Sequence, residues 1–70
     1  MLKKYELVEI AKAGGNIILN GGDYKKYELV EIAKSLKNGA TLQINNSGAL
    51  KKYELVDIVK ANPGSVIIAV

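Results

Sequence analysis

The ten-residue sequence KKYELVEIAK occupies Lys3–Lys12 and again Lys25–Lys34, and KKYELVDIVK occupies Lys51–Lys60. Each copy is followed by a turn that contains glycine, and then by a short segment of β-branched or alternating residues. These segments are Ile17–Asn20, Thr41–Asn45 and Val66–Val70. Self-similarity at a nearly fixed spacing is typical of repeat proteins, and here the unit is helix, turn and strand.

The ten-residue block predicts an amphipathic helix. In the first copy, Leu7, Val8 and Ile10 fall on one arc of a helix with 3.6 residues per turn. The first lysine of each pair, such as Lys3, would point into that arc, so we expect each helix to begin there with this lysine as the N-cap. The glutamate three residues later, such as Glu6, suits a capping box, although lysine itself is a poor cap.

The segments after the turns predict strands with one buried face. Leu42 and Ile44 alternate with polar residues in the middle segment, which is typical of a half-buried strand. Aligning all three segments on their preceding glycines predicts which side chains face the helices and which lie on the open face. The expected helix-facing residues are Ile17, Leu19, Leu42, Ile44, Ile67 and Ala69. The expected open-face residues are Ile18, Asn20, Thr41, Gln43, Asn45, Val66, Ile68 and Val70.

Strands that are separated by a single helix should run parallel, with right-handed crossovers. The fold class we predict is therefore α/β: three helix-turn-strand repeats forming a parallel three-stranded sheet, with the helices on one face, as a short αβ solenoid. The chain should be a single domain, 1–70, with repeats at 2–20, 24–45 and 50–70. We expect the strand order 1-2-3; the alternative is 1-3-2, with the third strand central and the molecule monomeric.

The unit ELVEIAKAGGNIILN, in which a short helix precedes a short strand ending in asparagine, resembles the ribonuclease-inhibitor type of leucine-rich repeat. The family's full strand signature, L-x-x-L-x-L-x-x-N, is not met. Only I-x-L-N at Ile17–Asn20 and L-x-I-N at Leu42–Asn45 correspond to it, and Val70 stands where the third strand would have asparagine. The resemblance implies a curved parallel sheet with helices outside and a concave sheet face that binds partners. It implies no catalytic residues.

Composition excludes much chemistry. The 70 residues include no Cys and no His, which removes disulfides, thiolate nucleophiles and imidazole bases. The glycines match no phosphate-binding loop and the acidic residues match no metal-binding motif, so we expect no enzyme, cofactor or metal. No apolar run approaches the roughly 20 residues of a membrane span, and no signal peptide is recognisable, so we expect no membrane partner and a cytoplasmic protein.

The chain is small, and its last strand is its most apolar segment. A chain of this size buries only about 60% of the surface that its unfolded form exposes, and an apolar edge strand is an aggregation hazard unless it is covered. We therefore expect a protein-interaction or self-assembly module that acts through its open sheet face and its C-terminal edge strand. Its expected partner is itself, as a homodimer or higher oligomer joined through the third strand, or another protein. The predicted protein interface comprises Ile18, Thr41, Gln43, Asn45, Val66, Ile68 and Val70.

Two other interpretations stay open. The lysine pairs hold six of the ten positive charges in a chain of net charge +3, and could form a ridge that binds nucleic acid or an acidic partner beside adjacent tyrosines. This ridge comprises Lys3, Lys4, Lys25, Lys26, Lys51 and Lys52. Glutamates nearby are equally typical of an ordinary solvated face. Near-identical blocks are also typical of recent duplication or of consensus design without a natural function, although the differing connecting segments argue against a strictly repeated design.

Overall fold

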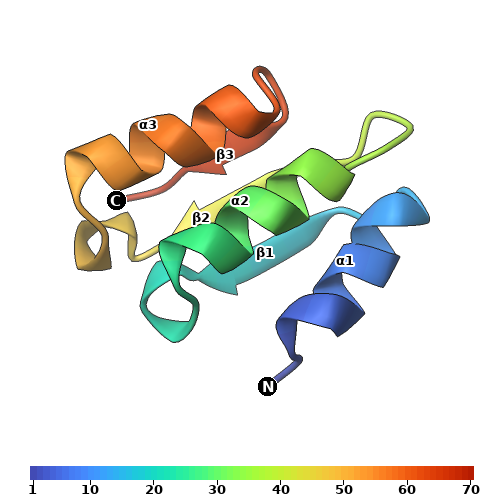
Figure 1. Ribbon diagram of the computed structural model, residues 1–70, viewed down its shortest axis with the longest axis horizontal. Coiled ribbons are helices and arrows are strands. Elements are labelled where there is room, and N and C mark those ends of the chain that lie inside the picture. The colour runs from blue at the N-terminus through green and yellow to red at the C-terminus, as the bar shows by residue number, and fades with distance from the viewer.

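The computed structural model describes residues 1–70 and contains three helices and one parallel three-stranded sheet (Figure 1). The helices are α1 (Lys4–Lys12), α2 (Lys26–Ser35) and α3 (Lys52–Ala61). The strands are β1 (Ile17–Asn20), β2 (Leu42–Asn45) and β3 (Val66–Ile68). Short 3-10 turns follow the first two strands: η1 (Gly21–Asp23) and η2 (Ser47–Ala49). The predicted small α/β fold is therefore confirmed.

All three helices begin where the repeated block predicts. Lys3, Lys25 and Lys51 are the N-cap residues, each with an extended backbone. The backbone N–H of each N-cap lysine donates to the carboxylate of the glutamate three residues later, at 2.8 Å in every repeat. The glutamate half of the capping box is therefore formed three times, while the lysine side chain offers no acceptor to the first turn.

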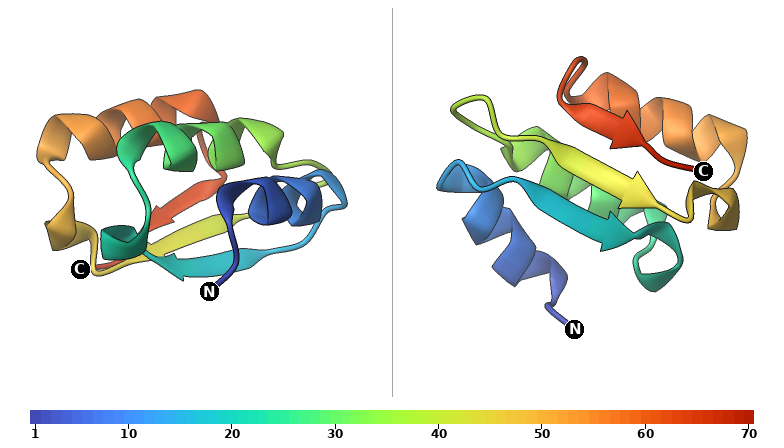
Figure 2. Two further views of the ribbon diagram at one scale, coloured as in Figure 1. Left: turned by 60° about the horizontal axis from the view of Figure 1, so that its bottom comes forward. Right: turned by 180° about the vertical axis from the view of Figure 1, so that it is seen from behind.

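The strands follow chain order, β1-β2-β3, and both pairs are parallel. The expected order is thus confirmed, and the alternative 1-3-2 order is wrong. All three helices lie on the same face of the sheet, as the edge-on view in Figure 2 shows, and they leave the other face uncovered. Because β2 is central, β1 and β3 each have one unpaired edge.

The core lies between the helix layer and the sheet. Side chains of α2 and β2 occupy its centre, and Leu29, Ile32, Leu42 and Ile44 have no exposed surface. The remaining core residues are Leu7, Val8, Ala11, Ile17, Leu19, Ala33, Leu36, Ala40 and Ile58. Only one of them, Ile58, comes from the third repeat, so the third repeat is the least buried part of the molecule.

The predicted faces of the third strand are wrong. Val66 pairs with Leu42 and Ile68 with Ile44, so Val66 and Ile68 lie on the helix side of the sheet. Ile67 pairs with Gln43 and lies on the open side. Val70 follows the end of β3 and is fully exposed. For strands 1 and 2 the predicted faces are confirmed, because Ile17, Leu19, Leu42 and Ile44 are all buried.

The error in the third strand comes from the length of one turn. Gly14, Gly39 and Gly64 occupy the equivalent left-handed position, with φ of +92°, +79° and +84°. Gly14 and Gly39 are each separated from their strand by a pair of residues, whereas Ser65 alone separates Gly64 from Val66. Since side chains alternate along a strand, one missing residue moves every side chain to the other face.

Candidate interaction surfaces

The same ion pair joins neighbouring helices twice. Lys4 Nζ of α1 lies 3.0 Å from Glu31 Oε1 of α2, and Lys26 Nζ of α2 lies 3.1 Å from Asp57 Oδ2 of α3. In both pairs, the lysine is the second residue of its ten-residue block. The acid, Glu31 or Asp57, is the seventh residue of the next block. The side chains are part-exposed, so each pair contributes at most about 1 kcal/mol. Their repetition defines which flank of a helix faces its successor.

Burial of the repeated apolar residues shows the same two flanks. The isoleucine of the block is fully buried in α2 and α3, as Ile32 and Ile58, but Ile10 of α1 is 39% exposed. The valine of the block shows the opposite trend in burial. Val8 of α1 is buried, whereas Val56 of α3 is 40% exposed. The isoleucine therefore faces the preceding helix, and the valine faces the following one.

On the side of α3 that faces away from α2, no helix packs in this structure and an apolar groove is open. We call this groove, together with the unpaired edge of β3, the α3–β3 end. The side chain of Ile68 forms the floor of the groove beside α3. The residues that line the groove are Lys52, Leu55, Val56, Val59, Lys60 and Ile68. Apart from the two lysines every lining side chain is apolar, which is typical of an interaction site.

At the other end, no helix packs in this structure on the side of α1 that faces away from α2. We call the exposed residues Glu9 and Ile10, together with the unpaired edge of β1, the α1–β1 end. Glu9 occupies the position in α1 that Glu31 occupies in α2 and Asp57 in α3. Glu9 makes no salt bridge in this structure, because no helix packs on the side of α1 that corresponds to the lysine-contacting side of α2 and α3.

Four of the residues predicted for the interface lie on the uncovered face of the sheet: Ile18, Thr41, Gln43 and Asn45. Ile18, Gln43 and Ile67 stand side by side across the three strands, and Ile18 is 67% exposed. Gln43 donates from Nε2 to Oδ1 of Asn45 at 3.0 Å, and the backbone N–H of Thr41 is satisfied by Asn16. This face is therefore mixed in polarity, with two separated isoleucines, whereas Val66 and Ile68 lie on the opposite side.

The predicted lysine ridge lies at one end of the helix layer, because the three helices run in the same direction (Figure 1). Lys4 and Lys26 are held in the ion pairs between helices, while the other four lysines of the ridge make no salt bridge. Tyrosine rings follow the lysine pairs and are similarly exposed in all three repeats. The exposed fractions are 59% for Tyr5, 62% for Tyr27 and 61% for Tyr53.

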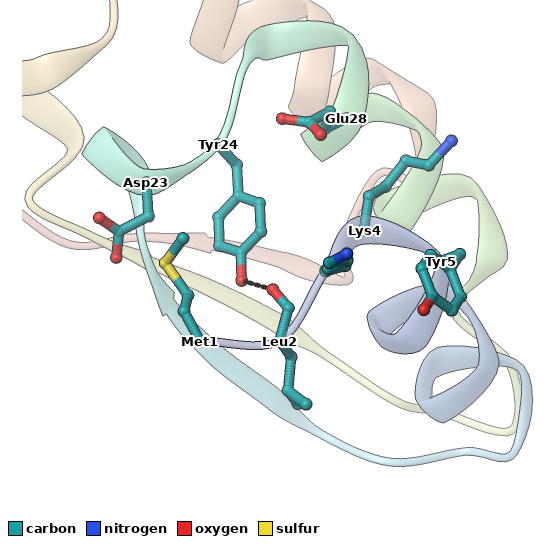
Figure 3. Close-up of a pocket in the computed structure, with 8 residues that line it drawn as sticks. Met1, Leu2, Lys4, Tyr5, Asp23, Tyr24 and Glu28 are labelled. Carbon is teal, nitrogen blue, oxygen red and sulfur yellow. Dashed lines mark hydrogen bonds between the residues drawn. The ribbon is translucent and has the colours of Figure 1, made fainter.

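A shallow cleft near the N-terminus lies between the start of α1 and η1. The hydroxyl of Tyr24 donates to the backbone carbonyl of Leu2 and so ties the N-terminal segment to the second repeat (Figure 3). Burial raises the pKa of Tyr24 above its usual value of 10.0, and the carboxylates of Asp23 and Glu28 raise this pKa further. A tyrosine hydroxyl is already neutral at pH 7, and the raised pKa of Tyr24 extends to higher pH the range in which this hydroxyl can donate its hydrogen bond.

No cluster of three acidic side chains that could hold a metal ion is present. None of the helices is long and apolar enough to cross a membrane. Comparisons with protein-family models, with curated proteins and with solved structures found no match to this chain. The surfaces of the molecule must therefore be interpreted from their own geometry and chemistry.

Sequence reasoning missed the two ends of the helix layer. The amphipathic pattern of the block predicts one apolar arc on each helix, including Leu55, Val56 and Val59 of α3, but it does not show whether a neighbouring helix covers that arc. The three near-identical blocks do indicate both ends, since among three helices packed in chain order only the middle one is covered on both sides.

Proposed function

We propose that this chain is a non-enzymatic repeat module that associates with copies of itself through its α3–β3 end. The observation that carries the proposal is the apolar groove beside an unpaired edge strand. The groove exposes Val56 and Ile68, which are 40% and 36% exposed. The equivalent surfaces of α1 and α2 are covered by the next helix, so association would complete a packing arrangement that the chain already uses twice.

The repeated architecture supports this proposal, and we propose that it is a short αβ solenoid like a leucine-rich repeat. Helix α2 packs against both α1 and α3, and the partners Ile17, Leu42 and Val66 stand in line across the sheet. Repeat proteins need roughly three units for stability, and their end units usually carry polar caps. An apolar end unit such as α3–β3 is therefore suited to binding a partner.

Sedimentation of the purified protein tests the proposal when the Val56→Lys variant is measured beside the wild type. We expect the wild type to exceed the single-chain mass of 7.5 kDa at high micromolar concentration. Val56→Lys should remain monomeric, because association would remove the new lysine charge in the groove from water. Gln43→Lys, on the open face of the central strand β2 and away from both ends, is the matched control and should associate like the wild type. Wild-type protein that remains monomeric at every concentration would contradict the proposal.

A second function is favoured by the exposed tyrosines beside the lysine pairs. Three equivalent rings stand next to lysines, four of which make no salt bridge, and this arrangement suits single-stranded nucleic acid, which stacks on aromatic rings and pairs with cations. Binding to mixed-sequence single strands should then fall steeply as salt rises. Replacing Tyr5, Tyr27 and Tyr53 with alanine should weaken it further. Absence of binding at low salt would remove this function.

A further inference from the structure

We propose that the α3–β3 end of one molecule binds the α1–β1 end of a second copy, in the arrangement by which α2 follows α1 within the chain. This inference rests on the proposed self-association and specifies the two surfaces that meet. Each copy would use two different surfaces, so the contact is head-to-tail and not a twofold dimer.

The charges of the two ends are complementary. Within the molecule, Lys4 contacts Glu31 and Lys26 contacts Asp57. Lys52 occupies the position of Lys4 and Lys26 in the third block, and Glu9 occupies the position of Glu31 and Asp57 in the first block, but neither makes a salt bridge. Head-to-tail docking would place Lys52 of one copy beside Glu9 of the next, and would form the same ion pair a third time.

The apolar residues of the two ends are complementary in the same way. Ile32 and Ile58 are completely buried against the preceding helix, whereas Ile10 is 39% exposed. Val56 is the valine of the block that no following helix covers, and it is 40% exposed. Docking would place Ile10 of the second copy against Val56 of the first, and would give it the environment that Ile32 and Ile58 already have. Val59 replaces the alanine of the other blocks and adds apolar surface to the groove.

The sheet edges fit the same arrangement. Strand β3 has one free edge, β1 has the opposite free edge, and all pairing in the sheet is parallel. Stacking a second copy in the register of the internal repeats would add its β1 beside β3 as a further parallel strand. The helix layer and the sheet would then continue together across the junction, which satisfies backbone groups that an edge strand otherwise leaves to water.

A twofold dimer through α3 is disfavoured by charge. The apolar groove is flanked by Lys52 and Lys60, and no acidic side chain lines it. A twofold axis places the same surface on both sides, so an antiparallel α3–α3 contact would bring these lysines together. Like charges brought together at an interface oppose association. Head-to-tail contact avoids this repulsion, and because each added copy exposes the same two ends it generates rings or open filaments.

Two blocked variants test this geometry. Ile10→Lys blocks the α1–β1 end and Val56→Lys blocks the α3–β3 end, and circular dichroism checks that both remain folded. We expect each variant alone to be monomeric by sedimentation. An equimolar mixture should form a dimer of twice the chain mass of 7.5 kDa, because each variant supplies the end that the other lacks.

The outcomes distinguish this inference from the proposed self-association. If Ile10→Lys alone associates as well as the wild type, the α1–β1 end is not used and the head-to-tail geometry is overturned, while self-association stands. Two monomeric variants that stay monomeric when mixed also overturn it. If the wild type itself never associates, the proposed function fails, and this inference fails with it.

A charge exchange at the exposed residues Glu9 and Lys52 provides a second test. Glu9→Lys and Lys52→Glu should each weaken association, by about two- to five-fold as expected for a surface pair. The double variant, which exchanges the two charges, should recover the wild-type association constant at the same ionic strength. The geometry is contradicted if Glu9→Lys has no effect, or if the double variant is as weak as the two single changes combined.

Discussion

At the scale of single residues, the repeats show the same side chain in three environments. Ile10, Ile32 and Ile58 occupy one position of the block, yet only Ile10 is substantially exposed. Their local sequences are nearly identical, so the difference comes from the presence or absence of a preceding helix. Sequence pattern alone therefore predicts that these residues are apolar contacts, but their burial depends on the neighbour that each repeat has.

The same isoleucine-to-alanine change in two repeats gives a matched pair of stability predictions. Ile32→Ala should lower the free energy of unfolding by about 2–5 kcal/mol, because it removes packing from a fully buried site. Ile10→Ala should cost clearly less, under about 1.5 kcal/mol, because much of its side chain already contacts water. Urea unfolding at a concentration where the protein is monomeric measures both. Equal losses for the two variants would contradict the environments described above.

The N-cap lysines give a prediction in the stabilising direction. Lys25 has the extended backbone of an N-cap residue, but its side chain cannot accept a hydrogen bond from the first turn of α2. Lys25→Ser should therefore raise the free energy of unfolding by about 1 kcal/mol. Thermal and urea unfolding measure the change. The neighbouring Lys26→Ser is the comparison: it lies inside the helix and would lose its ion pair with Asp57, so it should not stabilise.

At the scale of elements, the repeated block was sufficient to predict the helix starts, the parallel pairing and the faces of β1 and β2. The glutamates after the N-caps predicted the helix starts, and the alternation in Leu42–Asn45 predicted the strand faces, because both are local sequence signals. The faces of β3 were mispredicted since Val66–Val70 is apolar throughout and contains no alternation to fix its register. Register in such a strand is set by turn length and by tertiary packing.

The corrected register of β3 is tested by two adjacent isoleucines. Ile68→Thr should weaken both folding and self-association, because Ile68 lies under α3 in the groove. Ile67→Thr should change the free energy of unfolding by less than about 0.5 kcal/mol, because Ile67 lies on the open face. Urea unfolding and sedimentation of the two variants measure these effects. The reverse order of sensitivity would support the face assignment based on glycine alignment.

At the scale of the whole molecule, the three repeats form a stack whose two ends differ. One end presents a lysine and an apolar groove, and the other presents a glutamate and an exposed isoleucine. Sequence reasoning predicted that a stack of three thin units would favour a partner, bound through the open sheet face and the edge of the third strand, but it did not include the outer sides of the helix layer. The structure shows a second surface, where the contacts between repeats stop.

Sedimentation of the unmodified chain across a wide range of concentration tests the central proposal most directly. The proposal predicts an average mass that rises above 7.5 kDa as concentration increases, and that falls back when Val56 is replaced by lysine. A constant mass of one chain at every concentration, up to the solubility limit, would contradict self-association.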